Sequence, residues 1–180
     1  MDYFVMQQDD RYTEFPILQD VRQHIDIRHI NRLKSDHLAD TTIFQVIATE
    51  EAEALDLLTT QLYLVSEKMK QLIELYEPNC LFKLTPLIDR ARGKQLLYYL
   101  PIFEEVEALS PNTEFNLDGS VIRHLVLNEE KIRGKRIFRV KESETPLIII
   151  RLDIAESILR RDLIGVSLRR VPTEKEYLED

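Results

Sequence analysis

The pattern that most constrains the fold of this chain is a strand–strand–helix–strand order that occurs twice along it. In the first copy, the stretches 41–47 and 62–65 are rich in β-branched and large apolar residues, which favour strands. Ser66 follows as the expected N-cap of a helix. A strand over 80–84 completes the copy. The apolar positions of the helix recur every three or four residues, at Met69, Leu72, Ile73 and Tyr76.

The second copy lies towards the C-terminal end of the sequence. Two strands, a helix with an apolar stripe and a closing strand are predicted between residues 137 and 172. Gly165 is expected to end this helix, because glycine adopts the left-handed conformation of a C-terminal cap most easily. The spacing between the second strand and the helix is the same in both copies. We therefore predict an internal duplication in which 43–87 and 137–172 follow one β-β-α-β path.

The remainder of the chain fits the same fold class. Residues 1–42 are predicted to form an N-terminal strand followed by a polar arm, and further strands are expected over 95–103 and 120–127. No flexible linker separates the two copies. The sequence therefore predicts a single α+β domain over residues 1–180, with a mainly antiparallel sheet and two helices packed on it.

The charge balance restricts the partners that the chain can have. It carries 24 Lys and Arg residues against 32 Asp and Glu residues, a net charge of −8. Such a surface repels nucleic acid and anionic lipid and favours basic partners, although acidity also serves solubility alone. The longest apolar run, 147–150, is too short to cross a bilayer, and residues 1–6 lack signal-peptide features. We expect a cytoplasmic protein without nucleic-acid or membrane partners.

The sequence shows no catalytic constellation. A phosphate-binding loop needs clustered glycines, and a serine nucleophile elbow needs a Gly-x-Ser-x-Gly motif; neither pattern is present. Cys80 is the one cysteine, which excludes an internal disulfide and fits a reducing compartment. It lies in an apolar stretch and is expected to be a small buried hydrophobe rather than a nucleophile assisted by His124. We predict a protein that is not an enzyme and that holds no cofactor.

The histidines of the N-terminal arm are the strongest candidates for a metal site. His24 and His29 flank Asp26, and Asp36 and His37 follow, so these side chains would meet around a metal if the arm folded back. Their spacing differs from that of a zinc-protease helix. Polar arm residues are the favoured interpretation, no metal is predicted, and a metal-dependent hydrolase is kept as a weaker alternative.

Carboxylates and basic residues form separate clusters along the chain. Two acidic clusters are either solvated faces or docking surfaces for a basic partner. They consist of Glu50, Glu51, Glu53 and Asp56, and of Glu104, Glu105 and Glu107. A basic stretch over 131–141 contains one aromatic residue, Phe138, so it lacks the alternation typical of nucleic-acid binding. Such charges also protect a sheet edge against pairing with other chains.

Short strand and helix patterns over most of the chain resemble a bacterial family, the immunity proteins of polymorphic toxin systems. These patterns are Tyr3-Phe4-Val5-Met6, Leu64-Val65-Ser66-Glu67-Lys68-Met69-Lys70, Tyr98-Tyr99-Leu100, Ile137-Phe138-Arg139-Val140 and Gly165-Val166. The resemblance implies that the protein neutralises a cognate toxin, expected to be a basic domain, by direct binding in the cytoplasm of the producing cell. It transfers no catalytic residue.

If the resemblance holds, the acidic clusters are the expected contact surface. Glu50, Glu51, Glu53 and Asp56 would contact the toxin, supported by Glu104, Glu105 and Glu107. The main alternative is a scaffold or interaction module with an unrelated partner, such as a homodimer formed through a free sheet edge.

Overall fold

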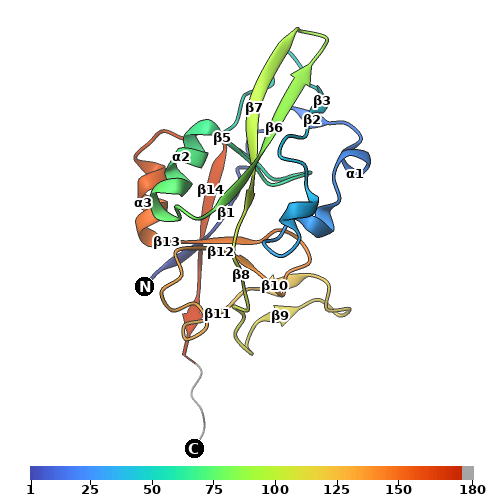
Figure 1. The fold of residues 1–180 in the computed structure, drawn as a ribbon. Helices are drawn as coiled ribbons and strands as arrows, with labels where there is room; N and C mark the ends of the chain where they lie inside the picture. The colour runs from blue at the N-terminus through green and yellow to red at the C-terminus, as the bar shows by residue number, and fades with distance from the viewer. Residues whose placement is uncertain (176–180) are drawn as a thin grey trace, which may run out of the picture.

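The computed structural model describes residues 1–175, and most of its strands belong to two sheets (Figure 1). The five-stranded sheet contains, in spatial order, β14 (Val166–Val171), β1 (Tyr3–Gln8), β13 (Ile148–Arg151), β12 (Ile137–Val140) and β8 (Glu105–Val106). The six-stranded sheet contains β2 (Ile17–Leu18), β3 (Phe44–Ile47), β6 (Leu81–Asp89), β7 (Lys94–Ile102), β5 (Leu64–Ser66) and β4 (Leu57–Leu58).

Helices and two small strand pairs complete the fold. The helices are α1 (Val21–His24), α2 (Glu67–Tyr76) and α3 (Leu152–Leu159), with 3₁₀ turns over Ile27–His29 and Ser35–His37. The small pairs are β9 (Glu114–Phe115) with β10 (Ile122–His124), and β11 (Leu127–Asn128) with β15 (Thr173–Glu174). The predicted α+β class with mainly antiparallel pairing is confirmed. No helix among residues 1–175 is long and apolar enough to cross a membrane.

The predicted start of α2 is confirmed at Ser66. Its side-chain oxygen accepts a hydrogen bond from the backbone N–H of Met69 at 3.2 Å, which satisfies one of the free N–H groups at the helix start. Met69, Leu72 and Ile73 are buried, as the helical spacing predicts. The helix therefore begins where the sequence places it and buries the expected face.

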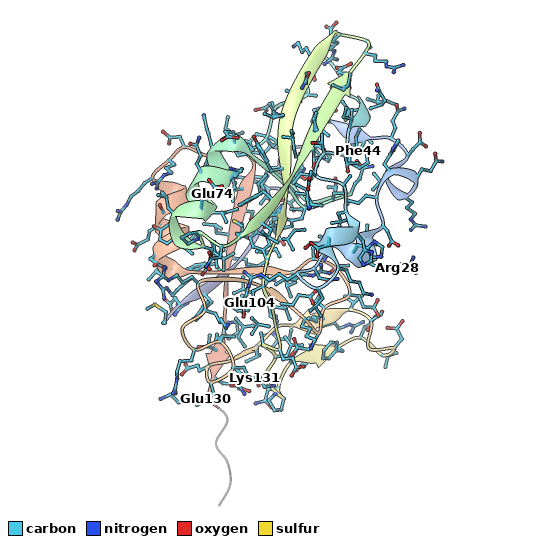
Figure 2. The ribbon with its side chains drawn as sticks, viewed as in Figure 1. Arg28, Phe44, Glu74, Glu104, Glu130 and Lys131 are labelled. Carbon is cyan, nitrogen blue, oxygen red and sulfur yellow. The ribbon has the colours of Figure 1, made fainter. Side chains whose placement is uncertain are left out.

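Three clusters of buried side chains form the core. One joins α2 and α3, which lie side by side in Figure 1, to both sheets. The second lies between the six-stranded sheet and the N-terminal arm and includes Ile25, Leu38 and Phe44. Of these, Figure 2 labels Phe44, near the β6–β7 hairpin. The third lies between the five-stranded sheet and the β9–β11 region and includes Val5 and Leu127. Each sheet is thus buried on both faces over part of its area.

Strand order corrects the predicted duplication. In the C-terminal copy β12 is the antiparallel neighbour of β13, whereas β3 is separated from β5 and runs parallel to β6. The predicted segments 43–87 and 137–172 therefore do not follow one path. The predicted first strand of the N-terminal copy forms as β3, but it is not a neighbour of β5 and so is not the counterpart of β12. The neighbour of β5 is β4, a buried two-residue strand in the acidic connection that the sequence pattern did not indicate.

With β4 as the first strand, the two units have the same strand order and directions. The orders are β4-β5-β7-β6 and β12-β13-β1-β14, and all neighbours are antiparallel. Each helix contacts the strand before it and the central strand of its unit, β7 or β1. In the first unit the central strand, β7, follows β6 in the chain. In the second unit the central strand, β1, is the first strand of the chain. A common origin of the two units stays a prediction.

Two further expectations are corrected. The stretch 120–127 is divided into β10 and β11 rather than forming one strand. Gly165 has the expected left-handed φ of 79°, but α3 already ends at Leu159, so this glycine is not its cap. Gly165 instead lies against Leu55, whose Cβ would be 2.8 Å from a Cβ added at the glycine. The missing side chain therefore lets the connection before β4 pack against the start of β14.

The close approach at Gly165 predicts a loss of stability in Gly165→Ala. The variant combines a left-handed backbone with a clash, so we expect the free energy of unfolding in urea to fall by about 2–4 kcal/mol. Gly93→Ala is the matched control, because Gly93 has a φ of 63° but no atom within 4 Å of an added Cβ. An equal loss in both variants would show that the contact with Leu55 contributes nothing.

Candidate functional site

Asp56 does not belong to a contact surface, in contrast to the sequence prediction. It is buried, and one carboxylate oxygen accepts a hydrogen bond from the Ser66 hydroxyl at 2.6 Å. The other oxygen accepts one from the backbone N–H of Ile164 at 2.7 Å. The backbone of Asp56 is bonded to the same two residues. This carboxylate therefore joins the start of α2 to the segment before β14 and is unavailable to a partner.

The second acidic cluster is compensated within the molecule. Because β8 runs parallel to β12, with Glu105 opposite Arg139, its carboxylates lie beside the basic stretch 131–141. The ion pairs are Glu104 with Lys135 at 2.5 Å, Glu105 with Arg139 at 4.0 Å and Glu107 with Lys141 at 3.1 Å. Figure 2 labels Glu104 near the middle of the molecule. These partners reduce the field that a docking protein would experience, so this cluster is the weaker candidate.

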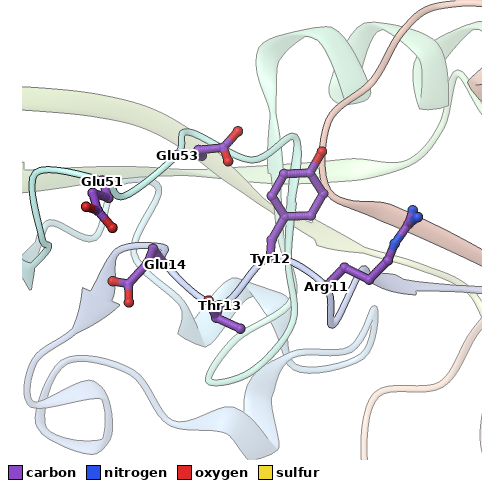
Figure 3. Close-up of a pocket in the computed structure, with 6 residues that line it drawn as sticks. All are labelled: Arg11, Tyr12, Thr13, Glu14, Glu51 and Glu53. Atoms are coloured by element: carbon purple, nitrogen blue, oxygen red, sulfur yellow. The ribbon is translucent and has the colours of Figure 1, made fainter.

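The remaining acidic residues border an open groove (Figure 3). Its volume is about 490 Å³, and its walls are arm residues 11–14 and the connection after β3. The backbone N–H of Glu53 donates to the carbonyl of Glu14 at 3.1 Å, and the Thr49 hydroxyl donates to a Glu14 carboxylate oxygen at 2.7 Å. Glu51 and Glu53 line the groove, and the exposed Glu50 is in the same connection. The arm residues were not predicted as part of a site.

The groove has an excess of negative charge. Arg11 lines it, but its guanidinium forms an ion pair with Asp9 at 2.6 Å, and hydrogen bonds from Arg11 lower the pKa of the Asp9 carboxyl. The side chains of Glu50, Glu51 and Glu53 form no ion pair with any residue in the described part of the chain. A cation entering the groove would therefore meet carboxylates without internal partners.

An apolar surface lies next to the groove on the six-stranded sheet. Ile17 of β2 is directly opposite Ile47 of β3, and these side chains are 44% and 61% exposed. The pairing of Gln45 with Ile88, together with the alternation of side chains along strands, places Ile88 and Leu97 on this same face. At the other end of the face, α2 covers the sheet. Exposed apolar residues gathered in this way are typical of binding surfaces.

Of the predicted metal-site residues, His29 lies beside both Asp26 and His37, whereas His24 packs elsewhere. Nε2 of His29 is 3.9 Å from a carboxylate oxygen of Asp26. Both carboxylate oxygens of Asp26 accept hydrogen bonds from Arg28, which hold the pKa of this carboxyl well below its usual range. His24 packs edge-on against Phe44, and the rings of His29 and His37 lie 5.0 Å apart. Within residues 1–175, no group of three or more His, Cys, Asp or Glu side chains is arranged to hold a metal ion.

Cys80 has the surroundings of a structural cysteine. It belongs to the core cluster around α2 and α3, and its thiol donates to the carbonyl of Ile102 at 3.6 Å. Burial raises the pKa of the thiol to about 12, so the thiolate needed for nucleophilic attack is scarce near neutral pH. His124, the partner considered from the sequence, is exposed on β10.

Comparisons with known proteins do not assign this chain to a family. No protein-family model matches it, and no curated protein matches it either. The similarity to immunity proteins therefore stays a prediction. The acidic groove and the adjoining apolar face are the features from which a function must be argued.

The different surroundings of Asp56 and Glu53 predict different effects of neutral substitutions. Asp56→Asn replaces a buried acceptor of two hydrogen bonds with a group that accepts on one side only, so unfolding free energy should fall by about 1–3 kcal/mol. Glu53→Gln changes an exposed side chain and should stay within about 0.5 kcal/mol of the parent. Urea unfolding measures both values. A stable Asp56→Asn protein would contradict the structural role of this carboxylate.

Proposed function

We propose that this chain is a non-enzymatic binding protein that neutralises a basic toxin domain by direct contact. The observation that carries the proposal is the difference between the two acidic clusters. Glu104, Glu105 and Glu107 have basic partners within residues 1–175, whereas Glu50, Glu51 and Glu53 have none among these residues. Uncompensated carboxylates beside exposed apolar residues are suited to a partner that presents Lys or Arg next to apolar side chains.

The size of the groove sets its role in such a complex. A specific protein interface buries about 800 Å² on each partner, and a groove of about 490 Å³ accommodates only a few side chains. In the proposed complex a basic side chain enters between Glu51 and Glu53, and the surface around Ile17 and Ile47 supplies apolar contact area. The carboxylates raise the encounter rate, while the apolar contacts slow dissociation.

A homodimeric scaffold is the second candidate, and the edge strand β14 favours it. Among the described residues, β14 has a single hydrogen-bonded neighbour, β1, so one side of this six-residue strand is open to pairing. However, antiparallel pairing of two copies would bring together the Arg169 and Arg170 residues of both strands, and like charges in such positions are destabilising. The acidic groove therefore supports the first proposal better.

Charge reversal at the groove tests the proposed function. The first partner to test is any toxic domain that a neighbouring gene encodes, and co-expression of this chain with that domain should rescue cell growth. In the triple variant Glu50→Lys, Glu51→Lys and Glu53→Lys, we expect the association rate constant at low salt to fall about 10- to 1,000-fold. High salt should reduce the difference, because surface charges are screened.

The control for charge reversal changes the same number of charges elsewhere. Asp36→Lys, Glu130→Lys and Glu156→Lys alter exposed carboxylates outside the groove, and this variant should associate at nearly the parent rate. Equal slowing in both triple variants would assign the effect to net charge rather than to the groove. Failure of the parent protein to bind the domain or to rescue growth would reject the proposal.

Substitutions on the apolar face around Ile17 and Ile47 test whether this face contacts the partner. The double variant Ile17→Ser and Ile47→Ser removes exposed apolar contacts, so dissociation of the complex should be about 10-fold faster while association is nearly unchanged. The control is Leu33→Ser with Leu117→Ser, which removes leucines that are 93% and 107% exposed outside this face. Surface plasmon resonance separates the two rate constants. Unchanged dissociation in the first variant would exclude the face from the interface.

A further inference from the structure

A second cavity, distinct from the acidic groove, is lined by arginines. It has a volume of about 250 Å³ and lies where β10, the turn between β12 and β13, and β14 meet. Arg123 comes from β10 and Arg169 from β14, two strands of different sheets. Because Arg169 is opposite Val5 on β1, it is on the sheet face that the β9–β11 region covers. The fold thus places two arginines in the wall of one cavity.

Neither of these arginines has a counter-ion in the described part of the chain. The side chains of Arg123 and Arg169 make no ion pair or hydrogen bond there, whereas the guanidinium of the neighbouring Arg170 is bound to Asp2 at 2.8 Å. Arginines that line another cavity beside Tyr3 are also compensated, since Arg133 and Arg151 pair with Glu130 and Asp153. In a chain with a net charge of −8, two uncompensated guanidinium groups at one cavity form a local positive site.

The acidic groups near this cavity do not fill it. None of the lining residues is Asp or Glu. Asp118 accepts hydrogen bonds from the hydroxyl and backbone N–H of Ser120, which lower the pKa of its carboxyl, and it does not line the cavity. Glu144 lies in the turn between two lining residues but is not one of them. Thr145 also lines the cavity.

The remaining wall of the cavity is apolar. Leu125 is buried, and Ile122 and Leu147 are half-buried, so their side chains offer a surface for a hydrocarbon group. Guanidinium groups bind carboxylate and phosphate oxygens in a geometry that matches both anions. The volume is below the usual range for drug-sized ligands, about 300–1,000 Å³. These features select a small molecule that has one acidic group and one apolar substituent.

We propose that this cavity binds a small organic oxyanion, a carboxylate or a phosphate monoester with one apolar substituent. Its acidic group lies between the guanidinium groups of Arg123 and Arg169, and its apolar group contacts Leu125 and Leu147. The site shares no lining residue with the acidic groove. It therefore stands independently of the proposed toxin binding.

Titration of the full chain with defined probes, followed by ¹H–¹⁵N NMR spectra, tests the site. Phenyl phosphate should give saturable shifts at 120–125, 143–147 and 167–169, with a Kd of about 1 mM or below. Inorganic phosphate should bind the same residues about 10-fold more weakly, because it lacks the apolar group. Benzyl alcohol, which lacks the charge, should give no saturable shifts there. Benzoate distinguishes carboxylate from phosphate ligands, and binding of either anion supports the site.

Single arginine substitutions provide the matched controls. Arg123→Gln and Arg169→Gln should each weaken phenyl phosphate binding about 10-fold, while Arg170→Gln, whose guanidinium is already paired, should leave it unchanged. Unchanged spectra elsewhere in the protein establish that each variant is folded. Equal weakening in all three variants, shifts spread over the basic residues of the whole surface, or no saturable shift with any of the anions would overturn the proposal.

Discussion

The buried carboxylate of Asp56 is the interaction on which the arrangement of the two β-β-α-β units depends. It accepts hydrogen bonds from Ser66 at the start of α2 and from Ile164 before β14, so it connects the two units directly. A buried carboxylate is costly unless it is fully hydrogen-bonded, and this requirement fixes both partners in place. Nearby, the Tyr63 hydroxyl donates to the carbonyl of Met6 at 2.8 Å. Polar contacts therefore hold the sheets together where β1 and β4 meet.

This junction also leaves specific surfaces free. Because α2 and α3 pack on each other, each covers only part of its own sheet, and the outer face around Ile47 stays exposed. The connection after β3 must reach β4 at the junction, which brings residues 50–53 past the arm and forms the groove. The same scaffold that buries Asp56 therefore exposes the three glutamates before it. Within one acidic stretch, Asp56 therefore has a structural role, whereas Glu50, Glu51 and Glu53 have the proposed binding role.

Several features that depend on residues close in the sequence were predicted correctly. Features that depend on pairing between distant segments could not be predicted from the sequence. The cap at Ser66 and the buried face of α2 depend on nearby residues, and both were predicted correctly. The strand β4 has two residues, and its pairing with β5 depends on burial against distant parts of the chain. The sequence could not separate Asp56 from Glu53, because the partner of Asp56 at Ile164 is remote in the chain. Likewise, the compensation of Glu105 by Arg139 follows from parallel pairing of β8 with β12.

In the proposed complex, a basic protein domain docks on the acidic groove and the apolar face beside it. Hydrogen–deuterium exchange of this chain, alone and in complex with a basic toxic domain that it neutralises, measures where such a domain binds. On binding, we expect slower exchange over residues 11–18 and 45–53, with little change over 104–107 and in β14. Protection confined to β14 or to the 104–107 cluster, with unchanged exchange at the groove, would rule out docking at the groove.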